Sequence, residues 1–201
     1  MRVGACLLLP FLTWAQPAFP LGAAVVIDVG GPCFAPEGPF ETLISQIEKR
    51  GWQATQRPED ALIEDLAWIH AVIYLNSDTG GASTANILEI QRKAARGLMR
   101  KKDIPQSKSR FFKNETSEVA ETLIFAWRKP QENVLQVDCR YSIRSKTESS
   151  QHNEASPSMI TSDHVRIGDT TVQRYSFNPT NFPGEKPPAV VIHTEHMTVS
   201  Q

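Results

Sequence analysis

Residues 71–81 read Ala71-Val72-Ile73-Tyr74-Leu75-Asn76-Ser77-Asp78-Thr79-Gly80-Gly81, an apolar run followed by small polar residues and glycines. The run Ala71–Leu75 is short, uncharged and rich in β-branched residues, which predicts a buried strand. Ala24-Val25-Val26-Ile27-Asp28-Val29 has a similar composition and ends at Gly30-Gly31, which predicts another. We expect the two runs to lie side by side as inner strands of one sheet.

Helical patterns alternate with these runs. Between Pro39 and Gly51 apolar residues recur at helical spacing, with proline at the start and glycine just past the end. A shorter helix is predicted from Pro58 through Leu66, and a longer one after a cap at Ser83 or Thr84. Strands that alternate with helices favour parallel pairing. Residues 24–102 are therefore predicted to form an α/β half, an open, mostly parallel sheet with flanking helices.

The second half of the chain has a period of two. From Leu135 to Arg144 apolar and polar residues alternate, which predicts a strand with one face in a core and the other in water. Gly168 is suited to the first position of a type II′ turn between two strands. Further strands are predicted within Val119–Trp127, Val165–Phe177 and Val190–Val199. Residues 118–201 are thus expected to form a mainly antiparallel β segment.

Residues 103–117, between these halves, are predicted to be a linker. The segment from position 92 to position 113 is strongly basic, with a single acid, Asp103. Its basic residues are Arg92, Lys93, Arg96, Arg100, Lys101, Lys102, Lys108, Arg110 and Lys113. A helix whose last turn suits its dipole, followed by a solvated loop, accounts for them. Nucleic-acid binding is not expected, because aromatic residues are sparse here and the whole chain has a net charge of -1.

The N-terminus predicts export. Met1-Arg2 precedes an almost unbroken apolar stretch that ends near Ala15, and Gln16 to Pro20 would break a continuing helix. We interpret residues 1–15 as a signal peptide, the alternative being a buried N-terminal element. No later apolar run approaches the ~20 residues that a membrane span needs. A soluble protein, secreted or periplasmic, is expected.

Signal cleavage would remove Cys6 and leave Cys33 and Cys139, an even pair in a compartment that permits disulfides. The pair is either a disulfide that closes a long loop or two separate buried thiols. Asn114-Glu115-Thr116 matches the N-glycosylation pattern, which matters only in a eukaryotic cell.

Two loops are candidates for a functional site. In open α/β sheets ligands bind outside the carboxyl ends of the strands, where the loop Asn76–Gly81 and the loop Asp28–Gly31 would face one crevice. Asp78, Ser77 and Asp28 are the candidate catalytic residues. Asn76, Gly80, Gly81, Gly30 and Gly31 are the candidate ligand-binding residues. The alternative interpretation is that these residues only form tight turns.

The same region resembles three families. Gly51-Trp52, Pro58-Glu59-Asp60-Ala61 and Ala71 to Ser77 resemble the trehalose-utilisation (ThuA-like) family, and the resemblance implies a glutamine-amidotransferase-like α/β fold. The glycine-rich strand ending in histidine that this family carries later has no counterpart here. Val25 to Pro32 with Tyr74 to Gly81 resembles the Clp-protease/crotonase superfamily, without its serine and histidine. Asp78-Thr79-Gly80 resembles the aspartic-protease triplet, in which two carboxylates share a proton.

His193-Thr194-Glu195-His196 is the remaining candidate for chemistry. On a strand His193 and Glu195 share a face while His196 points away, so this element alone is a poor metal site. No metal site and no cofactor is predicted, because nucleotide-binding, zinc-binding and nucleophile-elbow motifs do not occur.

The sequence therefore favours an exported, non-catalytic binding or interaction protein whose partner is unknown, with a protein or a carbohydrate as conceivable ligands. The competing hypothesis is a hydrolase or carbohydrate-active enzyme that uses the Asn76–Gly81 loop. Substitution of Asp78 separates the two, because only the enzyme would lose turnover without losing stability.

Overall fold

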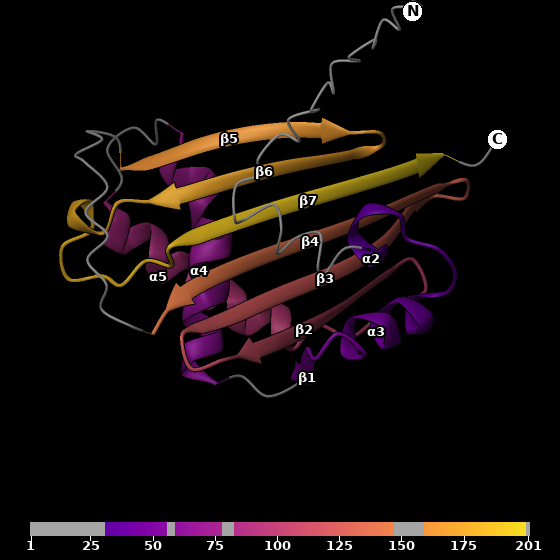
Figure 1. Cartoon of the computed structure of the whole chain (residues 1–201), viewed down its shortest axis with the longest axis horizontal. Helices are drawn as coiled ribbons and strands as arrows, with labels where there is room; N and C mark the ends of the chain where they lie inside the picture. The colour runs from indigo at the N-terminus through magenta and orange to yellow at the C-terminus, as the bar shows by residue number, and fades with distance from the viewer. Residues whose placement is uncertain (1–30, 56–58, 78–82, 147–158, 200–201) are drawn as a thin grey trace, which may run out of the picture.

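The computed structural model describes residues 31–55, 59–77, 83–146 and 159–199. Within these residues seven strands form one antiparallel sheet in the order β1-β2-β3-β4-β7-β6-β5 (Figure 1). The strands are β1 (Gln53–Thr55), β2 (Ser107–Glu115), β3 (Val119–Gln131), β4 (Val134–Ser145), β5 (Ile160–Ile167), β6 (Thr170–Phe177) and β7 (Val190–Val199). The predicted open parallel α/β sheet is therefore wrong, because every strand pair in this sheet is antiparallel.

Helices pack on both faces of the sheet (Figure 1). Helices α2 (Gly31–Phe34) and α3 (Phe40–Glu48) cover one face, and α4 (Asp60–Leu75) and α5 (Thr84–Met99) cover the other. A short 3-10 helix, η1 (Pro179–Asn181), precedes β7. No described helix is both long enough and apolar enough to cross a bilayer.

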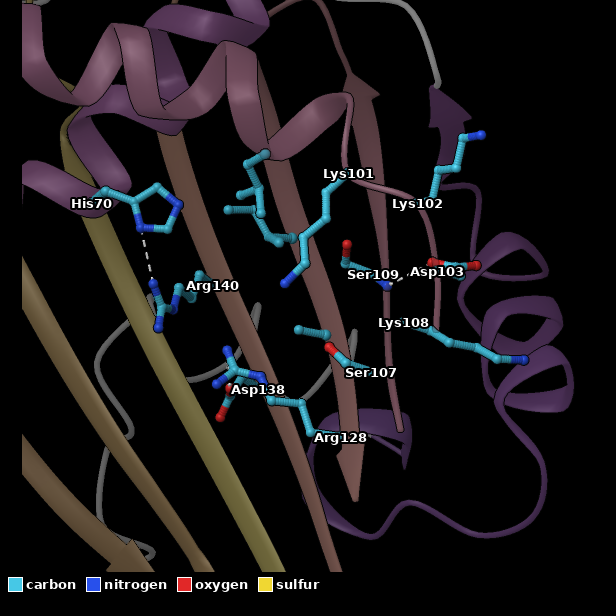
Figure 2. Close-up of a pocket in the computed structure, with 13 residues that line it drawn as sticks. His70, Lys101, Lys102, Asp103, Ser107, Lys108, Ser109, Arg128, Asp138 and Arg140 are labelled. Atoms are coloured by element: carbon cyan, nitrogen blue, oxygen red, sulfur yellow. Dashed lines mark hydrogen bonds and ion pairs between the residues drawn. The ribbon is translucent and has the colours of Figure 1, made fainter. Parts of the chain in front are cut away.

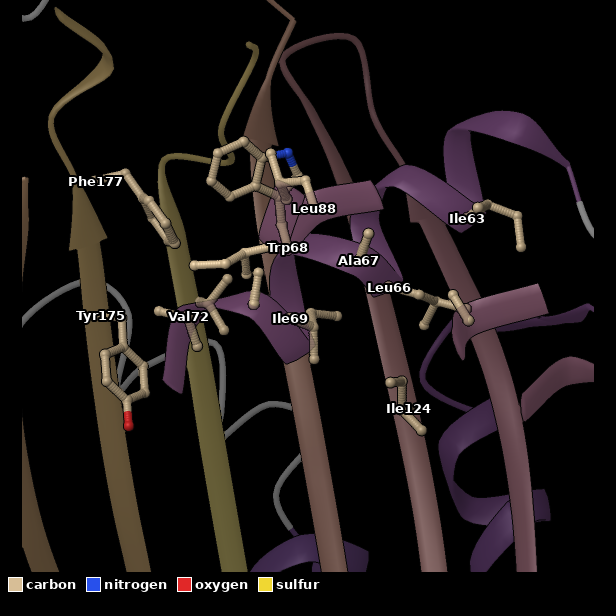
Figure 3. Packing of buried hydrophobic residues seen from close by; sticks show 14 of the residues in the cluster. Ile63, Leu66, Ala67, Trp68, Ile69, Val72, Leu88, Ile124, Tyr175 and Phe177 are labelled. Atoms are coloured by element: carbon tan, nitrogen blue, oxygen red, sulfur yellow. The ribbon is translucent and has the colours of Figure 1, made fainter. Parts of the chain in front are cut away.

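The sheet separates two cores because the side chains of a strand alternate between its faces. In β3, Leu123 and Phe125 are buried against α3, whereas Ile124 between them is buried on the α4–α5 face. The core on the α4–α5 face is built around Trp68, whose ring makes edge contacts with the rings of Phe177 and Phe182, both with centroids 5.4 Å away (Figure 3). The strand predicted within Leu135–Arg144 is confirmed by β4, but its polar face does not lie in water, because Asp138 and Ser142 on that face are buried.

The run Ala71–Leu75 is not a strand but the last turn and a half of α4. Leu62, Leu66, Ile69 and Val72 lie at helical spacing and are almost completely buried. Neighbouring Ala67 and Trp68 are buried as well, so α4 is apolar around most of its surface (Figure 3). A short apolar run in such a helix cannot be distinguished from a buried strand by periodicity. This difference removes the predicted parallel sheet, and with it the α/β fold that the ThuA-like resemblance implied.

The predicted linker is also wrong, because residues 107–115 form β2 in the interior of the sheet. Its basic residues, Lys108, Arg110 and Lys113, therefore belong to a paired strand and not to a solvated loop. Lys108 Nζ and the Arg110 guanidinium lie 5.2 and 5.1 Å from the centre of the Phe40 ring, which favours cation–π contact. Phe111 and Phe112 point to opposite cores.

Other predicted elements are confirmed. Helix α3 follows Pro39 and ends before Gly51, which has a φ of 90°. Ser83 caps α5, its hydroxyl accepting a hydrogen bond from the Asn86 amide at 3.3 Å. Gly168 has a φ of 59° in the two-residue turn between β5 and β6, where a glycine is favoured.

A disulfide joins Cys33 of α2 to Cys139 of β4, with the two Cα atoms 5.9 Å apart. Of the two interpretations of these cysteines, the structure contains the bonded one. The bond fastens α2 to the middle of the sheet. The predicted signal peptide and the predicted strand Ala24–Val29 lie outside the described residues.

Candidate functional site

Of the residues predicted to form the crevice, the structure describes Gly31, Asn76 and Ser77, and it does not bring these three together. Asp28, Gly30, Asp78, Gly80 and Gly81 lie outside the described part of the chain. Gly31 begins α2 on one face of the sheet, whereas Asn76 and Ser77 follow α4 on the other face. Ser77 Oγ donates to the carbonyl of Tyr74 at 3.0 Å, and Asn76 Nδ2 donates to Ser162 Oγ at 3.3 Å. The Ser77 side chain thus closes the end of α4, and the Asn76 side chain joins that end to β5.

A cavity of about 360 Å³ lies on the α4–α5 face of the sheet (Figure 2). His70 from α4 and Lys101, just beyond α5, line it on the helical side. Arg128 from β3 and Asp138 and Arg140 from β4 line the sheet side. The pattern that places the strand residues here is the period of two in β4, which puts Val137, Cys139 and Tyr141 into the opposite core.

Arg140 is the central group of this cavity. Its Nη1 donates to Nδ1 of His70 at 2.9 Å, as the dashed line in Figure 2 shows. Among the described residues, no carboxylate oxygen lies within 4.0 Å of the guanidinium. Burial lowers the pKa of Arg140, although the more distant Asp138 and Glu195 favour its charged form. Arg140 is half-buried, and a cation that has lost part of its hydration without gaining an ion-pair partner is unfavourable, since charges are normally paired when they leave water.

His70 is held as a neutral ring. Burial, and then the charge of Arg140, lowers the pKa of His70 to about 4. Because Nδ1 accepts the hydrogen bond from Arg140, the proton of the neutral imidazole is on Nε2. Nε2 is buried and has no hydrogen-bond partner among the described residues. The His70 ring therefore supplies a hydrogen-bond donor, and no positive charge, beside Arg140.

The other positively charged side chains that line the cavity differ in whether they point into it and whether they are paired. In Figure 2 the Lys101 side chain extends into the cavity, whereas those of Lys102 and Lys108 extend away from it. Lys108 Nζ lies 3.6 Å from Glu41 Oε1 beyond the sheet. Arg128 is neutralised by Asp138, with Nη2 3.1 Å from Oδ2. Two positive charges, on Arg140 and Lys101, thus face the cavity without an ion-pair partner among the described side chains.

A second, smaller hollow of about 170 Å³ lies on the other side of Arg140. Arg140 and Asp138 line both spaces. The other side chains at its walls include Thr171 and Gln173 from β6 and His193 and Glu195 from β7. His193 Nε2 is 3.0 Å from the carbonyl of Ile69, and burial lowers its pKa to about 3, so His193 is also neutral at physiological pH.

The other candidate residues from the sequence make contacts that stabilise the fold. As predicted, His193 and Glu195 share a face of β7; His196 is buried on the opposite face, where Nδ1 is 2.9 Å from Thr170 Oγ1. Within the described residues, no group of three His, Cys, Asp or Glu side chains is arranged to hold a metal ion. Asn114 lies in β2, and its Nδ2 donates to Glu121 Oε2 at 2.8 Å. Whether Asn114 carries a glycan stays a prediction.

The cavity cannot be predicted from the sequence, because the alternation in Leu135–Arg144 predicts a polar face in water, whereas Asp138 and Arg140 on that face line the cavity. Lys101 lies in the basic segment, whose composition predicts only the charged end of a helix. No motif could have linked Arg140 to His70, since their proximity depends on α4 crossing the sheet. No family model, curated protein or solved structure matches this chain at a significant level.

Proposed function

We propose that this protein is an exported, non-catalytic binding protein that holds a small anion in the cavity between α4, α5 and strands β2 to β4. The observation that carries this proposal is the half-buried guanidinium of Arg140, which lines the cavity, contacts a neutral histidine and makes no direct ion pair with a carboxylate among the described residues. An anion at this position would supply the missing charge. The donors of Arg140, Lys101 and His70 would then surround it.

Energetics favour such a complex. Each hydrogen bond between an ionised donor and an anion contributes about 1.5–3 kcal/mol, because the charge strengthens it. The guanidinium is already partly desolvated in the free protein, so part of the cost of burying it is met before the ligand arrives. Arginine also presents its donors in a rigid plane that matches the oxygens of a carboxylate or a sulfate.

The groups in the cavity bind charge rather than perform bond chemistry. Arg140 and Lys101 are cations, His70 is neutral with its Nδ1 occupied by Arg140, and Asp138 is paired with Arg128. None of these four is a nucleophile activated by a neighbouring base. The hydrolase hypothesis at the Asn76–Gly81 loop depends on Asp28 and Asp78, which lie outside the described residues.

Export is supported by the apolar stretch that ends near Ala15 and by the disulfide between Cys33 and Cys139. Structural disulfides persist mainly in oxidising compartments. Mass spectrometry of the protein recovered from the medium or the periplasm tests this part. Cleavage near Ala15 with the disulfide intact is expected, whereas an uncleaved, reduced intracellular chain would contradict export.

Isothermal titration calorimetry with sulfate and acetate tests the anion site. The wild type is expected to bind at least one of them, and Arg140→Gln is expected to remove the binding. Lys101→Gln and Lys102→Gln form a matched pair, because they remove the same charge from neighbouring positions. Only Lys101→Gln should weaken the affinity beyond the general effect of charge. Equal losses in both, or unchanged binding in Arg140→Gln, would refute the site.

A further inference from the structure

The two spaces that meet at Arg140 differ in chemistry. The cavity carries the unpaired positive charges of Arg140 and Lys101 (Figure 2). The second hollow carries uncharged polar groups and carboxylates, with Arg140 and Asp138 as the boundary between the two. A ligand that fills both spaces must therefore have an anionic end and an uncharged polar end.

The second hollow presents acceptors and donors in close succession. Gln173 Oε1 accepts from the Tyr175 hydroxyl at 3.1 Å, so the Gln173 amide group is oriented with its two N–H donors available. Glu195 Oε1 accepts from Gln136 at 3.0 Å, which leaves the second carboxylate oxygen as an acceptor. The hydroxyl of Thr171, in the same wall, can do either. Neighbouring hydroxyl groups of one molecule need this mixture, because each both donates and accepts.

Charge limits what the second hollow accepts. Glu195 lines it and has no ion-pair partner among the described residues, so its carboxylate would repel a second negative group placed there. A hydroxyl group would instead donate to it. Ile73, with 46% of its surface exposed, lines the same hollow and offers an apolar contact to the C–H face of a ring. No Phe, Tyr or Trp side chain lines the hollow among the described residues, and the His193 ring already packs against the ring of Tyr175, so a stacked base is not favoured.

From this juxtaposition we propose that the ligand is a sugar acid with a single negative charge. Its carboxylate or sulfate group binds Arg140 and Lys101 in the cavity, and its ring hydroxyls bind Thr171, Gln173 and Glu195 in the second hollow. The hollow of about 170 Å³ limits this part of the ligand to about one sugar ring. The inference rests on the proposed anion site and adds the chemical class of the molecule that carries the anionic group.

Calorimetry with a panel of four compounds tests the inference: glucuronate, glucarate, acetate and neutral glucose. Glucuronate is expected to bind about tenfold or more tightly than acetate, because about one extra hydrogen bond suffices for that factor. Glucarate, with a carboxylate at each end, is expected to bind more weakly than glucuronate. Glucose, which lacks the anion, should not bind measurably. Glucose 6-sulfate in place of glucuronate distinguishes a sulfate from a carboxylate as the bound group.

Variants of the second hollow separate this inference from the anion site. Gln173→Ala is expected to lower the affinity for glucuronate about tenfold while that for acetate is unchanged. Gln131→Ala, at an exposed glutamine near the end of β3, is the matched control and should change neither. If glucuronate binds no more tightly than acetate, or if Gln173→Ala weakens both equally, the sugar-acid inference is overturned and the anion site stands. If no anion binds at all, both fall.

Discussion

Arg140 and Arg128 show how one residue type has opposite effects on one face of a sheet. Arg128 neutralises Asp138, whose side chain is only 9% exposed. Arg140, two residues after Asp138 in β4 and on the same face, has a neutral histidine as its partner and makes no direct ion pair with a carboxylate among the described residues. Proteins tolerate an unfavourable, partly buried charge mainly where function needs it. The contrast makes stability itself a readout of the site.

The first prediction compares the two arginines. Without ligand, Arg140→Met is expected to raise the free energy of unfolding by about 1 kcal/mol or more, because an apolar side chain of similar length replaces an unpaired, half-buried charge. Arg128→Met is expected to lower it by about 1–3 kcal/mol, because it leaves the buried Asp138 without its ion partner. Urea titrations of both variants measure the two values. A loss of stability in Arg140→Met comparable to that in Arg128→Met would show that Arg140 has a structural role.

The second prediction concerns acid. The pKa values of His70 and His193 are about 4 and about 3 in the folded protein, both below the ordinary 6.5. The unfolded chain therefore binds more protons below pH 6.5, so stability falls as the pH decreases from 6.5 towards 4 for His70 and towards 3 for His193. Each group contributes a slope of about 1.4 kcal/mol per pH unit within its window.

His70→Gln keeps an oxygen that can accept from Arg140 but does not titrate. Its unfolding free energy should depend less steeply on pH, by about one proton, than that of the wild type. Denaturant titrations at several pH values between 6.5 and 4 measure the two slopes. The same slope in both proteins would mean that His70 titrates normally.

At the scale of elements, the sequence predicts those features that neighbouring residues determine. The caps and apolar spacing of α3 and α5 and the strand β4 are confirmed, since each is set by neighbouring residues. The run Ala71–Leu75 was misassigned, because only its continuity with Leu62–Val72 reveals a helix that is buried nearly all round. The candidate site could not be predicted for the same reason: Arg140 meets His70 only after α4 has packed on the sheet.

A prediction at this scale concerns the start of α5, the helix that carries Leu98 and leads to Lys101 at the cavity. Ser83→Ala is expected to lower the free energy of unfolding by about 1 kcal/mol, because it leaves the Asn86 amide without the Ser83 oxygen. Ser83→Asp keeps an accepting oxygen and should restore most of the loss. Thermal denaturation measures both. If the two variants lose stability equally, the hydroxyl at position 83 does not act as a cap.

At the scale of the whole molecule, the sheet separates the part of the protein that the disulfide stabilises from the part that contains the cavity. One face carries the disulfide and the core beneath α2 and α3; the other carries the cavity beneath α4 and α5. Cys33 and Cys139 are 106 positions apart, so their bond restricts a large part of the unfolded chain. Because the bond lies on the face opposite the cavity, its loss should affect stability more than binding.

The double variant Cys33→Ser, Cys139→Ser tests this separation. Its free energy of unfolding is expected to be lower by about 5 kcal/mol, the value that chain entropy gives for a loop of about this length. In the absence of denaturant the folded fraction should still bind the anion with unchanged affinity. Denaturant titration and calorimetry on one preparation measure the two quantities. A large loss of affinity in folded protein would show that the two faces are coupled.

The account depends most on the half-buried guanidinium of Arg140 and the anion that it would bind. Crystals soaked in selenate, an analogue of sulfate with an anomalous signal, test this most directly. The account predicts an anomalous peak within hydrogen-bond distance of Arg140, with Lys101 on its other side. Peaks confined to surface lysines, with Arg140 paired to Asp138 or Glu195, would contradict it.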